Sequence, residues 1–124
     1  MAYVHPGLLI VDDDPLIRDQ VSAFVRREGY VVETAANGRA ALTMLRRWFQ
    51  PCVILLDLMM PEMDGFEFRQ EQMADRALAM VPVITYSSVR DLATHAQQLG
   101  VTAYIHKPAA LDTIMSLVRQ HCLK

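Results

Sequence analysis

The sequence lacks both a long apolar run and an excess of positive charge. None of its apolar runs approaches the roughly 18 residues that a membrane span needs. The net charge is -2 and the basic residues are dispersed, which argues against a nucleic-acid-binding surface. The first residues contain no basic region and only a short apolar run, so we expect no secretory signal, no membrane partner and a cytoplasmic location.

Cysteine is also scarce. The two cysteines, Cys52 and Cys122, are too few for a disulfide framework, and we expect both to be reduced thiols. A chain of 124 residues can bury enough surface to form a core without such cross-links. The length and the hydrophobic content of 52% predict a single globular domain over residues 1–124.

The sequence does contain a regular alternation of short apolar runs and longer segments with helical spacing. The runs are rich in valine and isoleucine and are predicted to be strands at 8–11, 31–35, 53–56, 83–86 and 103–106. Between them, apolar residues recur at intervals of three and four, as in an amphipathic helix. Five strands alternating with five helices predict a doubly wound α/β fold with a parallel sheet.

The apolar runs also indicate where the functional site lies. Runs 8–11 and 53–56 are apolar throughout, as expected of central strands that are buried on both faces. Run 31–35 contains Glu33 and Thr34, so we expect an edge strand there. Ligands of such folds bind beyond the carboxyl ends of the strands, so functional residues should directly follow the runs.

Charged and hydroxyl side chains occupy those positions. Asp12 and Asp13 follow the first run, Asp57 the third, Ser87 the fourth and Lys107 the fifth. Each of them alone could be an ordinary loop residue, but their recurrence after successive strands predicts a common site. Neighbouring carboxylates repel, and a divalent cation such as Mg²⁺, which prefers oxygen ligands, removes that repulsion. A lysine and a hydroxyl beside such a cation suit phosphoryl transfer to an aspartate.

The third carboxylate of the "VDDDP" segment has a different expected role. Asp14 is a preferred helix-capping residue, and Pro15 suits the first position of a helix. We therefore expect Asp14 to turn away from Asp12 and Asp13 and to begin the first helix.

Four segments of the sequence resemble the receiver domains of two-component response regulators. They are "LLIVDDDP", "LLDLMMPEMDG", the hydroxyl after "VPVITY", and "YIHKP", and the likeness covers essentially the whole chain. The resemblance implies a flavodoxin-like, CheY-like (βα)5 sandwich with strand order 2-1-3-4-5. It also implies Mg²⁺ as the cofactor.

The resemblance assigns a role to each acidic residue of the site. Asp57 would be the phospho-acceptor and a metal ligand, Asp13 would bind Mg²⁺ directly, and Asp12 would assist through a water. The backbone carbonyl of Met59 would be a further ligand. Ser87 would hydrogen-bond the phosphoryl group.

The remaining family positions concern charge, switching and loop shape. Lys107 would form an ion pair with the phosphoryl group, aimed by a cis peptide bond before Pro108. Tyr104 matches the switch aromatic, which turns inward when Ser87 moves toward the phosphate; a partly buried sheet tyrosine is compatible with that role. Pro61 and Gly65 would shape the loop after the acceptor.

Some positions depart from the family pattern. Ser87 stands where threonine is commoner, and Ser88 stands where a small apolar residue is usual, which narrows access to Asp57. Met59 and Val89 occupy two positions that vary in the family, and both are apolar here. Neither side chain can orient a hydrolytic water, so we expect slow self-dephosphorylation.

The resemblance implies a signalling switch and not an enzyme with turnover. Its phosphoryl donors would be a sensor histidine kinase, a phosphotransfer protein or a small acyl phosphate. Phosphorylation would change the face formed by the fourth helix, fifth strand and fifth helix, and with it binding to a downstream protein or output domain. We expect a monomer or weak homodimer that does not bind nucleic acid directly.

Three other functions share part of this pattern. A haloacid-dehalogenase-type phosphohydrolase also forms an aspartyl-phosphate with Mg²⁺, but it needs an acid/base aspartate where this chain has Met59. A degenerate receiver that only binds proteins does not need the complete acidic set and Lys107. A flavin-binding relative needs a phosphate loop after the first strand, where this chain has carboxylates.

Overall fold

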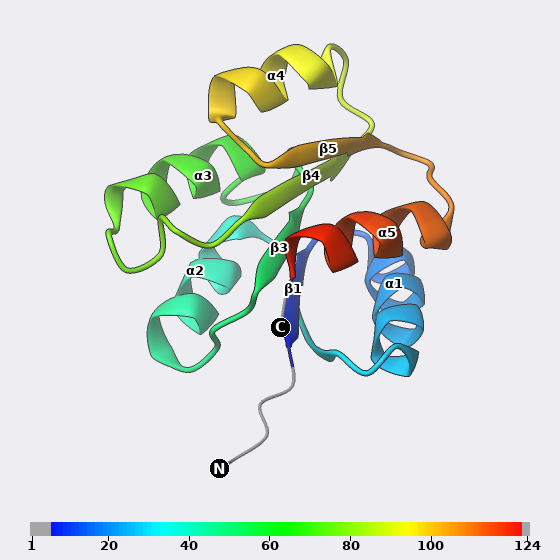
Figure 1. Cartoon of the computed structure of the whole chain (residues 1–124). Helices are drawn as coiled ribbons and strands as arrows, with labels where there is room; N and C mark the ends of the chain where they lie inside the picture. Colours follow the sequence, from blue (N-terminus) through cyan, green and yellow to red (C-terminus); the bar gives the residue numbers. More distant parts are fainter. Residues whose placement is uncertain (1–5, 123–124) are drawn as a thin grey trace.

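The computed structural model describes residues 6–122 and contains the predicted parallel sheet, in the order β2-β1-β3-β4-β5 (Figure 1). The strands are β1 (Gly7–Val11), β2 (Val31–Ala35), β3 (Val53–Leu56), β4 (Val83–Ser87) and β5 (Ala103–His106). The helices are α1 (Pro15–Arg27), α2 (Gly38–Arg47), α3 (Gly65–Ala74), α4 (Leu92–Leu99) and α5 (Leu111–His121). The α/β fold class and the strand order predicted from the sequence are therefore confirmed.

Two layers of helices cover the sheet because successive strand residues point to opposite faces. Leu8 and Ile10 of β1 belong to a core cluster with residues of α1 and α5. Leu9 and Val11 belong to a second cluster with residues of α2, α3 and α4. Figure 1 shows the same division, with α1 and α5 on one side of the sheet and the other three helices opposite.

The helix boundaries follow from local capping. Asp14 caps α1 by accepting the N–H of Leu16 at 2.9 Å, and Pro15 is the first helical residue. Asp64 and Glu67 form a reciprocal capping box at the start of α3. These caps fix where α1 and α3 begin after the loops that follow β1 and β3. No helix among residues 6–122 is long and apolar enough to cross a membrane.

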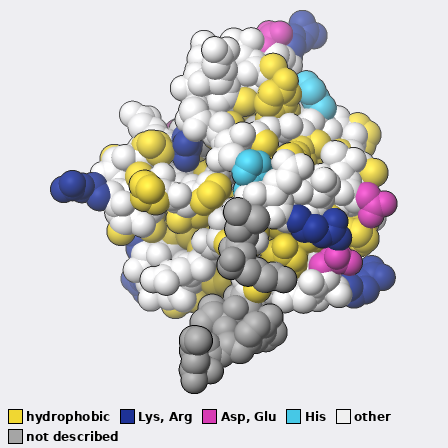
Figure 2. Space-filling model, in the orientation of Figure 1, with side chains coloured by type: hydrophobic (Ala, Val, Ile, Leu, Met, Phe, Trp, Pro, Cys, Tyr) yellow, Lys and Arg dark blue, Asp and Glu magenta, His cyan; other side chains and the backbone are white. Residues whose placement is uncertain are grey.

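The surface carries no concentrated basic region on the face seen in Figure 2. Lysine and arginine side chains are scattered around that face, and some of them lie near acidic ones. The edge strands are partly uncovered, as Val31 of β2 and Tyr104 of β5 are 45% and 47% exposed. The edge position expected for run 31–35 is therefore confirmed.

The cysteines differ from the expectation. Cys52 and Cys122 form a disulfide, with 5.1 Å between their Cα atoms, and the prediction of two reduced thiols is wrong. Cys52 directly precedes β3, and Cys122 directly follows α5, which runs back along the sheet to the starts of the strands. Their separation of 70 residues hides this neighbourhood in the sequence.

Candidate functional site

The site residues lie at the carboxyl edge of the sheet because the strand ladder continues one residue beyond the strands. Asp57 donates its N–H to the carbonyl of Val11 at 2.9 Å, and Lys107 donates its N–H to the carbonyl of Ser87 at 3.0 Å. In the same way, the N–H of Asp12 donates to the carbonyl of Ala35 at the end of β2, at 3.0 Å. The sheet backbone thus fixes the starting points of these three side chains.

Three carboxylates meet at this edge. One oxygen from each of Asp12, Asp13 and Asp57 lies within 4.8 Å of the others. Asp12 and Asp57 are buried, with 2% and 6% exposure, whereas Asp13 is exposed. The strand order places Asp57 between the end of β1 and the end of β4, so the cluster lies at the centre of the edge.

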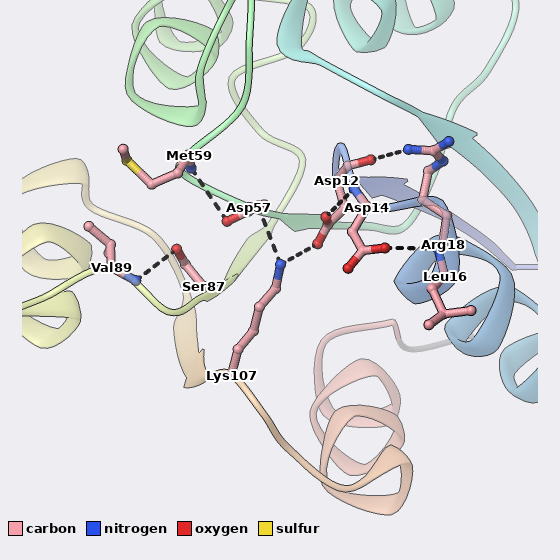
Figure 3. A network of polar contacts seen from close by, with 9 residues as sticks. All are labelled: Asp12, Asp14, Leu16, Arg18, Asp57, Met59, Ser87, Val89 and Lys107. Carbon is pink, nitrogen blue, oxygen red and sulfur yellow. Dashed lines mark hydrogen bonds and ion pairs between the residues drawn. The ribbon is translucent and has the colours of Figure 1, made fainter.

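Lys107 crosses from the end of β5 to the two buried carboxylates (Figure 3). Its Nζ lies 2.7 Å from Asp12 Oδ2 and 3.3 Å from Asp57 Oδ2. Burial of the ammonium lowers its pKa, but the hydrogen bond to Asp12 and the charges of Asp57 and Asp12 outweigh burial, so the pKa of Lys107 is raised. The lysine therefore stays charged and compensates the neighbouring acids.

Asp12 has the most constrained carboxylate of the group. Burial raises its pKa, and this effect exceeds the opposing hydrogen bonds from Lys107 and from the N–H of Asp14 at 2.9 Å. Its backbone carbonyl accepts a hydrogen bond from Arg18 Nη1 at 2.6 Å. The sequence did not identify Arg18 as a residue of the site. Only its position one turn after Pro15 could have indicated this contact.

The loop after β3 is shaped by close backbone contacts. The N–H of Met59 points to Asp57 Oδ1 at 3.4 Å, and the N–H of Gly65 donates to the carbonyl of Leu58 at 3.0 Å. A Cβ atom at Gly65 would collide with the backbone of Asp57 and Leu58, so only glycine fits there. Pro61 is exposed in the same loop.

The hydroxyl residues after β4 separate into a buried and an exposed one. Ser87 is fully buried, and its Oγ accepts the N–H of Val89 at 3.2 Å. This contact uses a lone pair of Ser87 Oγ, so the hydroxyl proton of Ser87 can be donated to another acceptor. Ser88 is exposed, and Val89 packs against the core on the α2–α4 side.

Tyr104 of β5 and Tyr86 of β4 differ in burial and in their relation to Lys107. The Lys107–Pro108 peptide bond is cis. Tyr104 is exposed and lines a hollow of about 530 Å³, together with residues of α4, of the loop before β5 and of α5. Tyr86 is buried, and the centroid of its ring lies 5.3 Å from Lys107 Nζ. The sequence reading missed Tyr86, although it directly precedes Ser87 in "VITYSS".

The donor set suits Mg²⁺. Mg²⁺ favours octahedral oxygen ligation, with one or two carboxylates and several waters. The exposed Asp13 and the buried Asp57 and Asp12 offer such oxygens within 4.8 Å of one another. Lys107 already places one positive charge against two of the three carboxylates, which shows that the edge requires cationic compensation.

Comparisons with known proteins agree with this geometry. The family model of the response regulator receiver domain matches residues 8–119. The chain is 34% identical to RpaA, a DNA-binding dual master transcriptional regulator of Synechocystis, over 92% of this chain and 48% of RpaA. It is also 34% identical to a 14.6 kDa protein of Leptolyngbya boryana, over 94% of this chain and 89% of that protein.

A solved structure shows the same fold. Chemotaxis response regulator CheY4 of Vibrio cholerae matches with a TM-score of 0.85 and 29% identity, over 94% of this chain and 98% of CheY4. The chain spans about half the length of the first curated relatives that it matches. Since the family match covers most of the residues and the acidic edge lies within it, the chain belongs to the response regulator receiver family of two-component signalling.

Proposed function

We propose that Asp57 accepts a phosphoryl group and that the protein is a phosphorylation-dependent switch. The main support is the position of Asp57, which is buried at the centre of the acidic edge and faces Lys107 at 3.3 Å. A carboxylate oxygen of Asp57 attacks phosphorus, a phosphorus–oxygen bond forms, and the phosphorus–nitrogen bond of a phosphohistidine breaks. The donor is a sensor histidine kinase or a phosphotransfer protein, and a small acyl phosphate can replace it.

The surrounding residues have distinct roles in this transfer. Asp13 and Asp57 would hold Mg²⁺ together with the backbone carbonyl of Met59, and Asp12 would assist through a water. Mg²⁺ held there would supply positive charge that offsets the charge on the phosphoryl oxygens. Lys107 moves from Asp12 toward the phosphoryl group, where it forms an ion pair.

The switch follows from the added charge. An aspartyl-phosphate carries additional negative charge and strong acceptor oxygens, by analogy with other phosphorylated side chains. The Ser87 hydroxyl, which has a proton to donate, turns toward these oxygens. Tyr104 then moves inward from its exposed position, and the surface formed by α4, β5 and α5 changes. A downstream protein or output domain reads this change.

The remaining features of the proposal concern the protein as a whole. The domain comprises residues 1–124 and acts as a monomer or weak homodimer, without direct contact to nucleic acid. Met59 offers no acid/base group beside Asp57, which supports a switch over a phosphohydrolase with turnover. The complete set of carboxylates with Lys107 supports a receiver that is phosphorylated and not a degenerate one.

Acetyl phosphate with Mg²⁺ tests the acceptor directly. We expect the intact mass of the wild type to rise by about 80 Da, the mass of one phosphoryl group. Asp57→Asn should show no adduct, because the nucleophilic oxygen is lost. Asp64→Asn is the matched control, since it makes the same exchange at a helix cap that asparagine also fills. An adduct on Asp57→Asn equal to that on the wild type would refute the assignment.

A further inference from the structure

We propose that Tyr86 is a positioning residue that holds the Lys107 ammonium at the phosphoryl site through the face of its ring. This role rests on the proposed function of Asp57 as acceptor. The ring centroid lies 5.3 Å from Lys107 Nζ, within the roughly 6 Å over which an ammonium and an aromatic face attract each other.

The sheet explains why these two side chains meet. Tyr86 in β4 is paired with Ile105 in β5, and Lys107 follows β5 directly. Tyr86 belongs to the core cluster beneath α1 and α5, together with Ile105 and Ile114. Packing therefore fixes the ring, and the lysine ammonium lies over it while it contacts the carboxylates.

The ring differs in kind from the other partners of the ammonium. Asp12 and Asp57 are also the residues expected to serve the metal and the phosphoryl group, so their contacts with Lys107 must change when either is bound. An aromatic ring does not ligate Mg²⁺ and gains no charge during the transfer. Tyr86 can thus hold the lysine while its carboxylate partners are exchanged.

Burial of Lys107 strengthens its contact with the Tyr86 ring. The Lys107 side chain is only 15% exposed, and the attraction between a cation and a ring is strongest where water is excluded. Because the attraction comes from the ring face, phenylalanine should replace tyrosine, whereas leucine should not. Leucine still fills an apolar position of the cluster, so the comparison of the two variants separates ring chemistry from packing.

Lysine-selective NMR tests the contact without any phosphorylation. The chain has two lysines, Lys107 and Lys124, so isotope-labelled lysine gives two sets of side-chain signals, and Lys124→Arg assigns them. We expect the ε-methylene protons of Lys107 to be shifted upfield by the ring. The shift should remain in Tyr86→Phe and vanish in Tyr86→Leu. Its absence in the wild type, or its persistence in Tyr86→Leu, would overturn the proposal.

Phosphorylation by acetyl phosphate tests the role. We expect Tyr86→Phe to react within about twofold of the wild type and Tyr86→Leu about tenfold more slowly, as a contact of this strength implies. In a Lys107→Ala background, Tyr86→Leu should have no further effect, because the ring acts through the lysine. Additive effects, or equal rates for Tyr86→Leu and Tyr86→Phe, would contradict this role.

The two tests also separate this inference from the proposed function. A wild type that takes no phosphoryl group refutes the proposed function and the role of Tyr86 together. A wild type that is phosphorylated at Asp57, while Tyr86→Leu reacts at an unchanged rate, refutes only the role of Tyr86. Melting curves of both Tyr86 variants show that the compared proteins are folded.

Discussion

The two ends of the same sheet are held together in opposite ways. At the carboxyl end, Asp12 and Asp57 are joined by the ammonium of Lys107. At the amino end, a covalent bond joins Cys52 to Cys122. A parallel sheet gathers its strand ends at both edges, and here three carboxylates and a lysine meet at the carboxyl edge.

The amino end is closed by short, directed contacts. The N–H of Cys52 donates to the carbonyl of Gly7 at 2.7 Å, across the starts of β1 and β3. The ring of Phe49 lies so close to Gly7 that a Cβ atom there would be 3.1 Å from it. Figure 1 shows the last turn of α5 arriving beside these strands.

This difference between the two ends indicates which of them can rearrange. An ion pair can be exchanged for another cation or for a phosphoryl group, whereas a disulfide and a packed ring cannot. The carboxyl end can therefore rearrange while the amino end keeps the strands and α5 in register. Removing the disulfide at the amino end or a carboxylate at the carboxyl end, one at a time, should show that the two ends respond independently.

The largest expected effect is at the amino end. Reduction of the Cys52–Cys122 disulfide should lower the free energy of unfolding by about 4 kcal/mol, because it opens a long loop in the unfolded chain. Urea denaturation with and without a reducing agent measures this change. Phosphoryl acceptance at the opposite edge should be unaffected.

The variant Cys52→Ala/Cys122→Ala is the control for the reducing agent. Its unfolding midpoint should be the same with and without reductant, since no disulfide is present. Equal stability of the oxidised and reduced wild type would show that the cross-link does not secure the amino end.

A smaller effect is expected at the carboxyl end. Mg²⁺ at ten times its dissociation constant should stabilise the protein by about 1.4 kcal/mol, because it binds the folded acidic cluster. Asp13→Ala should lose most of this gain, since the exposed ligand is removed. Melting curves at several Mg²⁺ concentrations measure the difference.

Asp19→Ala removes an exposed carboxylate of α1 outside the cluster and is the matched control. Its response to Mg²⁺ should equal that of the wild type. The same response in Asp13→Ala would place the cation elsewhere. Reduction of the disulfide should leave the Mg²⁺ response intact, which keeps the two ends independent.

The sequence predicted the carboxyl end far better than the amino end, for a physical reason. The strand runs and the rule that ligands bind beyond strand ends depend on local periodicity, so Asp57 and Lys107 could be placed at one edge. The Asp14 cap was likewise a local signal and is confirmed. The disulfide depends on where α5 ends relative to β3, and no local pattern reports that.

Buried polar contacts between helices were equally hidden. Arg69 of α3 is 7% exposed and donates to the carbonyls of Leu99 and Gly100 at the end of α4, at 3.0 and 2.9 Å. Burial lowers the pKa of Arg69, and these carbonyls with the Gln72 side chain compensate its charge. The sequence shows only an arginine in a helical segment, because its backbone partners lie some thirty residues away.

The smallest expected effect concerns the lifetime of the phosphorylated state. The Met59 side chain is 59% exposed beside Asp57, and its thioether cannot orient a water for attack on phosphorus. Met59→Asn introduces an amide that can do so, and we expect the phosphorylated form to decay faster by less than about tenfold, or under about 1.4 kcal/mol in the barrier. Intact mass followed over time after removal of acetyl phosphate measures the decay.

Met73→Asn provides the comparison for this last substitution. Met73 is 50% exposed on α3, so the exchange has the same chemistry away from the acidic edge. Its phospho-lifetime should equal that of the wild type. A wild-type lifetime shorter than that of Met59→Asn would show that Met59 does not protect the phosphoryl group. In that case the carboxyl end would favour rapid loss of the phosphoryl group. The contrast between the exchangeable carboxyl end and the fixed amino end would then rest only on the ion pairs and the disulfide.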